Sequence, residues 1–259
     1  MTALITGASG GIGLELARIS AAHGHDLVLV ARRESLLLDL ARTLAKEHGV
    51  RAEAIAADLS HPHVAAAVVD RTAALGMDVD ILVNNAGVGL YGLFSETSLD
   101  AEVEMIQLNI TALTELTRLL LPGMLDRRSG RILNVASTAS FQPGPLMAVY
   151  YATKAYVLSF SEAISNELEG TGVTVTALCP GPTASGFQAA ANLEESKLFA
   201  GKTLPSSAEV AAFGYDAMMK GTPVAVHGFA NKLLVQTPRF SPRAAVRKAV
   251  RSFQEKRQD

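Results

Sequence analysis

The chain has 259 residues, of which 49% are hydrophobic, with 23 basic and 25 acidic side chains. This length suits one domain of the larger α/β kind, big enough to bury a substantial core. The balanced charge gives no sign of a nucleic-acid partner. The single Cys179 excludes an internal disulfide, and without clustered cysteine or histidine residues we expect no metal site.

The N-terminus carries no charged segment followed by an apolar one, and no apolar run reaches the roughly 18 residues of a membrane span. We therefore expect a cytoplasmic protein. Cys179 lies in an apolar run, where it is expected to be a small buried hydrophobe. His61 and His63 flank Pro62 and are interpreted as surface residues rather than metal ligands.

A glycine-rich loop follows the first apolar run, Ala3–Thr6, and leads into a helix-forming stretch, Ile12–Ala22. The loop reads T-G-A-S-G-G-I-G. Glycine permits a tight turn and lets the backbone approach a pyrophosphate, which then sits at a helix N-terminus where free N–H groups attract negative charge. A turn needed for packing alone is the alternative. The predicted dinucleotide-binding residues of this loop are Gly7, Ser9, Gly11, Ile12 and Gly13.

The second apolar run, Leu27–Val30, ends in Ala31, Arg32 and Arg33. An acidic residue about 20 positions beyond the glycines would accept hydrogen bonds from the ribose 2′-hydroxyl of NAD. Ala31 stands at that place, and either arginine is suited to bind a 2′-phosphate. This pattern predicts NADP(H) as cofactor, the alternative being an exposed pair of arginines at the start of a helix.

Apolar runs and helix-compatible stretches alternate along the rest of the chain. The further predicted strands are Ala52–Ala57, Ile81–Val83, Ile132–Val135, Val173–Cys179 and Val224–Val226. The further predicted helices are Glu34–His48, Pro62–Leu75, Leu99–Leu121, Ala148–Leu168 and Ser207–Met219, the last opened by a capping box of Ser206 and Glu209. This alternation predicts a single α/β domain over residues 1–259, a doubly wound, Rossmann-type parallel sheet of about seven strands.

Polar residues follow several of these strands. Asn84–Gly87 follows the fourth strand, Ser137 closes the fifth, and Pro180–Thr183 follows the sixth. Open α/β sheets bind ligands in the crevice at the carboxyl ends of their strands. We therefore expect these loops and the glycine loop to meet around one ligand.

Tyr150 and Lys154 are four residues apart in an Ala-rich helical stretch. Positions i and i+4 of a helix share a face, with Cβ atoms roughly 5–6 Å apart. A nearby ammonium favours phenolate and is expected to lower the pKa of the tyrosine towards the range of an acid–base catalyst. Tyr151 is about 100° away around the helix and is expected to pack or to form a substrate wall.

Together these motifs resemble those of the short-chain dehydrogenase/reductase family over essentially the full length. The resemblance rests on T-G-A-S-G-G-I-G, Asp58-Leu59, N-N-A-G, Asn109, Ser137, Y-Y-A-T-K and the P-G-P-T turn. It is strongest to the branch that reduces carbonyls of small or lipid-like molecules. The family implies hydride exchange between a nicotinamide and a carbonyl or alcohol carbon, without a metal. One departure is Gly10, where many NADP-using relatives carry a basic residue.

The resemblance implies a role for each motif residue. Tyr150 gives a proton to the carbonyl oxygen, Ser137 orients that oxygen, and Lys154 lowers the tyrosine's pKa and bonds the nicotinamide ribose. Asn109 supports a water that reprotonates Tyr150. The remaining cofactor contacts are implied for Asp58, Leu59, Asn85, Ala86, Gly87, Pro180, Gly181 and Thr183.

The substrate pocket is expected to be apolar, which favours a hydrophobic ketone or aldehyde. Its candidate lining residues are Tyr91, Leu93, Phe141, Leu146, Met147, Phe187 and Phe199, and residues 183–205 form a predicted substrate-covering segment. The tail, 241–259, is a predicted basic amphipathic helix with Val246, Val250 and Phe253 on one side. Docking on its own chain or a neighbouring subunit is the favoured interpretation, and contact with an anionic membrane is the alternative.

Two other functions remain open from the sequence. One is a non-catalytic dinucleotide sensor, which typically loses the tyrosine or lysine that this chain retains. The other is an isomerase or dehydratase that uses the same Tyr150 and Lys154 pair. By resemblance alone, a homodimer or homotetramer is expected to form through helices around Glu102–Leu120 and Ala148–Leu168.

Overall fold

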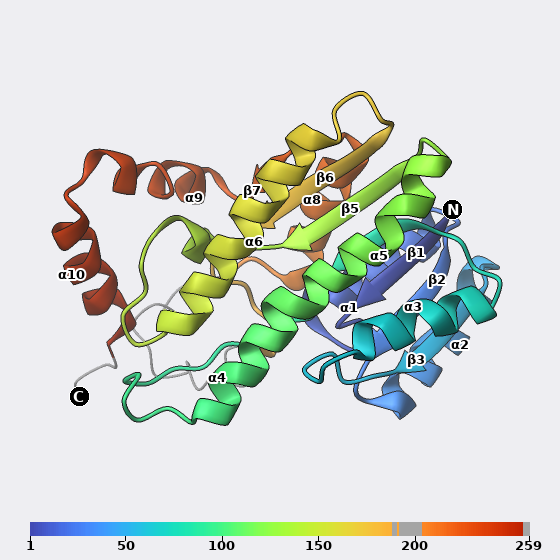
Figure 1. Ribbon diagram of the computed structural model, residues 1–259, viewed down its shortest axis with the longest axis horizontal. Helices are drawn as coiled ribbons and strands as arrows, with labels where there is room; N and C mark the ends of the chain where they lie inside the picture. Colours follow the sequence, from blue (N-terminus) through green and yellow to red (C-terminus); the bar gives the residue numbers. More distant parts are fainter. Residues whose placement is uncertain (188–190, 192–203, 256–259) are drawn as a thin grey trace.

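The computed structural model describes residues 1–187, 191 and 204–255. Its centre is a seven-stranded parallel sheet with the strand order β3-β2-β1-β4-β5-β6-β7 (Figure 1). The strands are β1 (Thr2–Thr6), β2 (Asp26–Ala31), β3 (Ala52–Ala56), β4 (Val79–Asn84), β5 (Gly130–Val135), β6 (Val173–Cys179) and β7 (Val224–Val226). This confirms the predicted doubly wound sheet, and each predicted strand is present with ends that differ by at most two residues.

Helices cover both faces of the sheet. One face packs against α1 (Gly11–Ala22), α2 (Glu34–His48) and α8 (Ser207–Met219). The other packs against α3 (Val64–Ala74), α5 (Leu113–Asp126) and α6 (Ala148–Glu167), which lie in front of the strands in Figure 1. Alternate residues of each strand point to opposite faces, so Ile5 and Leu29 join the first layer while Leu4 and Val28 join the second.

The predicted helix Leu99–Leu121 is helical throughout, but its hydrogen-bond pattern changes in the middle. An α-helix, α4 (Leu99–Ile106), passes into a π-helical turn, η1 (Gln107–Ala112), before α5 begins. Isolated π-turns are rare and occur frequently at functional sites. The predicted start of α3 at Pro62 also shifts to Val64, because His63 has a φ of 66° and cannot belong to a right-handed helix.

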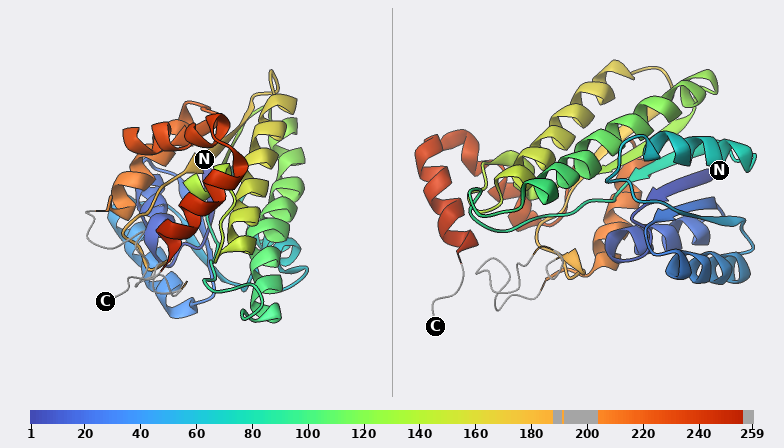
Figure 2. Two further views of the ribbon diagram at one scale, coloured as in Figure 1. Left: turned by 90° about the vertical axis from the view of Figure 1, so that its left-hand side faces the viewer. Right: turned by 60° about the horizontal axis from the view of Figure 1, so that its bottom comes forward.

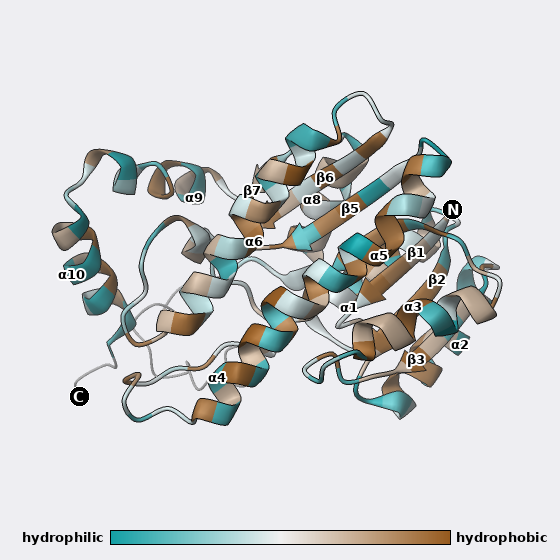
Figure 3. Cartoon of the chain, viewed as in Figure 1, coloured by the Kyte–Doolittle hydropathy of each residue, from teal (hydrophilic) through white to brown (hydrophobic). Residues whose placement is uncertain are grey.

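The last part of the chain forms a small helical lobe. It comprises α9 (Phe229–Leu234), the 3₁₀ turn η3 (Thr237–Phe240) and α10 (Arg243–Gln254). The lobe lies beyond the carboxyl ends of β5 and β6, at the left of Figure 1, and Figure 2 shows α10 running across that end of the molecule. In Figure 3 the sheet strands are largely hydrophobic, whereas much of α10 is hydrophilic.

The tail helix packs on its own chain through one side. Val250 and Gln254 are buried, while Arg243, Arg247 and Arg251 are exposed. Phe253 does not take part in this packing, because its side chain is 59% exposed. Within the described ranges, no helix has the length and apolar character needed to cross a bilayer.

Candidate active site

The loops at the carboxyl edge of the sheet enclose a cleft of about 470 Å³. Fifteen of the predicted site residues line it, drawn from the ends of β1, β2, β4, β5 and β6 and from α6. They are Gly7, Ser9, Gly11, Ile12, Arg32, Arg33, Asn85, Ala86, Gly87, Ser137, Tyr150, Lys154, Pro180, Gly181 and Thr183. The parallel arrangement therefore brings together segments that are up to 176 positions apart, from Gly7 to Thr183.

Four predicted site residues lie outside the cleft wall. Gly13, Asp58, Leu59 and Asn109 are not among the described residues that line the cleft. Leu59 is buried in the apolar layer around β2 and α3, where its hydrophobic side chain is stabilised. Asp58 is connected to the cleft through Arg32, whose Nη1 lies 3.9 Å from Asp58 Oδ2.

The glycine loop is compact because two of its glycines have no room for a side chain. Gly7 has a φ of 67°, and a Cβ there would lie 2.6 Å from Asn85 Nδ2. A Cβ on Gly13 would collide with the main-chain oxygen of Gly7. Gly13 therefore acts behind the cleft wall, where it lets α1 approach the end of β1.

Thr6 ties the first loop to the fourth. Its Oγ1 accepts hydrogen bonds from the main-chain N–H groups of Asn85 and Ala86, both at 3.0 Å, and donates to Val83 O at 3.2 Å. Asn85 returns the contact by donating from Nδ2 to Thr6 O at 2.9 Å. These bonds hold the N-N-A-G turn against the glycine loop, so the two loops are joined directly to each other.

The two arginines after β2 point to different sides of the cleft. Arg33 donates from Nη2 to Ser9 O at 3.3 Å and to Ser9 Oγ at 3.2 Å, and this nitrogen lies 3.7 Å from where a Cβ of Gly10 would be. Arg32 instead leans towards Asp58. The guanidinium of Arg33 therefore lies beside Gly10, the position at which this chain has no basic residue of its own.

Asp58 remains ionised beside Arg32. Burial alone would raise the pKa of its carboxyl, but two hydrogen bonds from Ser60 and the nearby Arg32 and His61 lower it below the ordinary value. The side chain is therefore an ionised acceptor held close to Arg32 at the edge of the cleft.

Lys154 is a buried cation at the base of the cleft. Its side chain donates from Nζ to Val135 O at 2.7 Å, and Ser140 Oγ donates to the main-chain oxygen of Lys154 at 2.7 Å. Burial disfavours the ammonium form and lowers the pKa of Lys154 to about 8. The nitrogen lies 5.9 Å from the centroid of the Tyr150 ring.

The pKa of Tyr150 is raised, not lowered as the sequence predicts. Burial raises it to about 12, and the hydrogen bond from Ser137 opposes this only in part. The physical reason is that Lys154 points at the Val135 carbonyl, so desolvation outweighs its attraction for phenolate. Tyr150 is therefore a neutral phenol at pH 7, the protonation state of a proton donor.

Ser137 is fixed in front of Tyr150 by the backbone. It caps a short 3₁₀ turn, η2 (Thr138–Phe141), and its Oγ accepts from Ala139 N at 3.1 Å. The same hydroxyl group lies 3.5 Å from Pro180 O after β6. The loops that follow β5 and β6 are thereby joined at the point where Ser137 and Tyr150 meet.

Asn109 is buried in the π-turn and holds the loop after β4. Its Oδ1 accepts from Val88 N, and its Nδ2 donates to Val88 O and Thr153 Oγ1, all at 3.0 Å. With these bonds the side chain of Asn109 holds the Gly87–Val88 segment against α6. A water bound by Asn109, as the resemblance implies, would therefore use its main chain.

The substrate end of the cleft is apolar. It is lined by Met147, Tyr151 and Phe187, with Leu234 from the C-terminal lobe. Tyr151 packs as expected, edge-on to Tyr150 with ring centroids 6.0 Å apart. Of the other predicted lining residues, Phe141 faces a second cavity, Tyr91, Leu93 and Leu146 do not line the cleft, and Phe199 lies outside the described residues.

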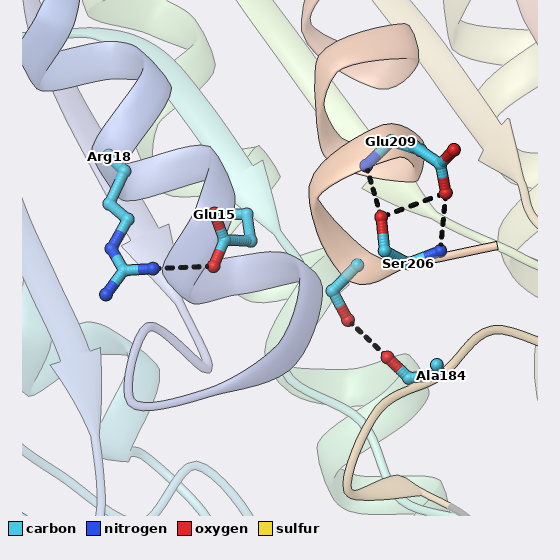
Figure 4. Close-up of polar contacts among 6 residues, drawn as sticks. Glu15, Arg18, Ala184, Ser206 and Glu209 are labelled. Carbon is cyan, nitrogen blue, oxygen red and sulfur yellow. Dashed lines mark hydrogen bonds and ion pairs between the residues drawn. The ribbon is translucent and has the colours of Figure 1, made fainter.

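The loop after β6 is anchored to the start of α8. Ser206 and Glu209 form the predicted capping box, with Ser206 N donating to Glu209 Oε2 at 2.7 Å and Glu209 N donating to Ser206 Oγ at 3.2 Å (Figure 4). The next residue, Ser207, donates from Oγ to Ala184 O at 2.9 Å. Most of the predicted covering segment, 183–205, lies between these anchors and outside the described residues.

The sequence reasoning missed several residues of the site. Ser140 and Thr153 hold Lys154 and Asn109 from behind, and Leu234 and Gln254 come from the C-terminal lobe. Small hydroxyl residues of this kind are common along the chain and have no distinguishing spacing. The lobe residues lie far from the motifs in sequence, so only the folded chain connects them.

Comparison with known proteins assigns the class. The short chain dehydrogenase family matches residues 1–196, and the chain belongs to this family. Ketoacyl reductase HetN of Nostoc sp. is 40% identical over 181 residues, which cover 70% of this chain and 62% of that protein. The match thus spans about three fifths of this relative's length.

Two solved structures resemble the whole fold. A short-chain dehydrogenase from Sphingobium yanoikuyae in complex with NADPH is 34% identical, with a TM-score of 0.82 over 96% of this chain and 97% of the other. The bulky-bulky ketone specific alcohol dehydrogenase from Comamonas testosteroni is 29% identical, with a TM-score of 0.78 over 96% and 95%. Both similarities cover nearly the whole of this chain.

Because Lys154 is held in an unfavourable environment, its removal should stabilise the fold. We expect Lys154→Met to raise the free energy of unfolding at pH 7 by roughly 1–3 kcal/mol. Between pH 8 and about 10 the unfolded chain binds more protons at this lysine than the folded one. The stability of the wild type therefore rises with pH in this range, and the difference in stability between wild type and Lys154→Met becomes smaller. Urea unfolding of both proteins across this range measures the effect.

Lys232→Met, at an exposed lysine of α9, is the control and should leave stability unchanged. A Lys154→Met protein that is less stable than wild type at pH 7, with a difference independent of pH, contradicts the prediction.

Proposed function

We propose that this protein is an NADP(H)-dependent oxidoreductase that reduces an apolar ketone or aldehyde to an alcohol. The observation that carries the proposal is the meeting of Ser137, Tyr150 and Lys154 in one cleft with the glycine loop and Arg33. Family membership and the NADPH complex of the Sphingobium relative support the same conclusion.

The shape and charge of the loop fit a phosphorylated dinucleotide. Gly7 and Gly11 leave the main chain open to a pyrophosphate at the N-terminus of α1. Arg33, poised above Ser9 and Gly10, would bind the 2′-phosphate with a planar pair of donors. Asn85–Gly87 would flank the adenosine ribose side of the cofactor. When bound, the reduced nicotinamide supplies the hydride for the carbonyl carbon.

Tyr150 supplies the proton in this proposal. Its phenol is neutral at pH 7, and a carbonyl oxygen that gains negative charge during reduction is a better proton acceptor than water. Ser137 would donate a hydrogen bond to the same oxygen and fix its position. The ammonium of Lys154 stabilises the phenolate that remains, which a buried site without a cation would strongly disfavour.

The substrate is proposed to be apolar and of ketone class. The described residues at the substrate end of the cleft present Met147, Tyr151, Phe187 and Leu234, with no cation to hold a carboxylate or phosphate. Relatives are named as a ketoacyl reductase and as a bulky-bulky ketone specific alcohol dehydrogenase, which supports a ketone substrate. NADPH consumption across ketones, aldehydes and oxoacyl thioesters tests this class. If none is reduced, the proposed activity fails.

A homodimer is proposed to form through α4 and its neighbours. Leu99, Val103 and Ile106 project from one face of α4 at helical spacing and are 74%, 55% and 41% exposed. Leu119 and Tyr156 add exposed apolar surface on α5 and α6. Several exposed apolar side chains on neighbouring helices support an interface between subunits here.

Replacing the proposed proton donor tests the mechanism. Tyr150→Phe keeps the ring but removes the hydroxyl, and should lower kcat by about 10³-fold or more. Tyr156→Phe changes a tyrosine of the same helix whose hydroxyl is hydrogen-bonded to Thr114, and should keep kcat within about twofold. Steady-state NADPH oxidation measures both. Equal turnover by the two variants would remove Tyr150 from the mechanism.

Cofactor choice is tested at Arg33. Arg33→Ala should raise KM for NADPH by about 10- to 100-fold, because it removes a charge-assisted contact worth roughly 1.5–3 kcal/mol, and should leave KM for NADH nearly unchanged. Arg18→Ala is the control, since Arg18 lies on α1 and is paired with Glu15 away from the cleft (Figure 4). An NADH preference in the wild-type enzyme would refute the NADP(H) assignment.

The proposed interface is tested by introducing a charged side chain on α4. Val103→Glu should shift the protein to monomers in analytical ultracentrifugation, because a carboxylate in an apolar interface is costly to desolvate. Leu36→Glu, at a residue of α2 that is 42% exposed, should leave the assembly as it is. A wild-type protein that sediments as a monomer contradicts the proposal.

A further inference from the structure

The last turn of α10 is hydrogen-bonded to two tyrosines of the substrate side. Gln254 donates from Nε2 to Tyr151 Oη at 2.7 Å, and Tyr91 Oη donates to the main-chain oxygen of Gln254 at 2.9 Å. Gln254 is 1% exposed and Tyr151 is 7% exposed. A buried amide is costly unless it is hydrogen-bonded, so these contacts define one position for the end of the helix.

Tyr151 also separates two cavities. One side of its ring lines the candidate active-site cleft, and the residue lines a second cavity of about 550 Å³ between α6, η2 and the C-terminal lobe. The ring lies directly on Gly144, where a Cβ would collide with it. The second cavity has a largely apolar wall that includes Phe141, Ala155 and Val246.

The hydrogen bond to Gln254 determines where this ring stands. Around it the contacts are apolar, from Ala139, Met147 and Val250, and such packing is non-directional. A hydrogen bond between two buried side chains is directional and therefore selects one arrangement of the phenol. Without it, only this non-directional packing would hold the phenol in place.

We propose that Gln254 is a specificity-determining residue, which holds Tyr151 as the partition between the cleft and a second apolar subsite. With the partition closed, the cleft admits a carbonyl with at least one small substituent. When it opens, the second cavity receives the long or bulky apolar arm of a ketone. This inference rests on the proposed carbonyl reduction and assigns the substrate range of that site to the C-terminal helix.

The test compares kcat/KM for a short methyl ketone and for a diaryl ketone. Gln254→Met keeps the side-chain volume but removes the hydrogen bond, and should raise the diaryl-to-methyl ratio by about tenfold, mainly through a lower KM for the diaryl ketone. Tyr151→Phe removes the same bond from the other side and should shift the ratio in the same direction. Lys248→Ala, on the exposed side of α10, should leave the ratio unchanged.

A second measurement does not depend on turnover. Tryptic cleavage after Arg247 and Arg251 should be about tenfold faster in Gln254→Met than in wild type, because the end of α10 is released more often. NADPH affinity, measured by fluorescence, should be the same in both proteins. If wild type reduces no ketone, the proposed function fails while the cleavage result still reports on the contact.

Two outcomes overturn the inference. One is a Gln254→Met enzyme that loses activity equally towards both ketones, which would make Gln254 purely structural. The other is a shifted ratio in Tyr151→Phe with none in Gln254→Met, which would place selectivity in the tyrosine alone.

Discussion

The hydrogen bond from Lys154 to the carbonyl of Val135 joins helix α6 to the end of β5 in the interior of the protein. It fixes the cation, and through the helix it fixes Tyr150 one turn earlier. Burial of these groups lowers the pKa of Lys154 to about 8 and raises that of Tyr150 to about 12. At pH 7 Lys154 is therefore largely an ammonium and Tyr150 keeps its proton, so the cleft presents a proton donor beside a buried cation.

The part of the cleft formed by the glycine loop and the N-N-A-G turn is held in place by other contacts. Thr6 bonds two successive N–H groups of the N-N-A-G turn, and the glycine loop has no space for side chains at Gly7 and Gly13. Asn109, in the π-turn between α4 and α5, then holds the Val88 segment against α6. The glycine loop, the N-N-A-G turn and α6 are therefore linked through buried polar side chains, a connected network that favours a single geometry.

The substrate half depends on a part of the chain that carries no recognisable motif. The C-terminal lobe contributes Leu234 to the cleft and Gln254 to the support of Tyr151. Its arginines are exposed, and its buried residues are few among those described, with Val235 after α9 and Val250 and Gln254 on α10. A region held by few buried contacts is expected to open more readily than the sheet.

The sequence by itself determined the sheet, the cleft and most of its lining, because apolar runs of strand length and glycine spacing are local properties of the chain. It could not determine that Asn109 lies in a π-turn, that Leu59 faces the core, or that burial would raise rather than lower the pKa of Tyr150. Those features depend on how far a group is from water and on which atoms face it. Distances of this kind, like that between Gln254 and Tyr151, 103 positions apart, exist only after the chain has folded.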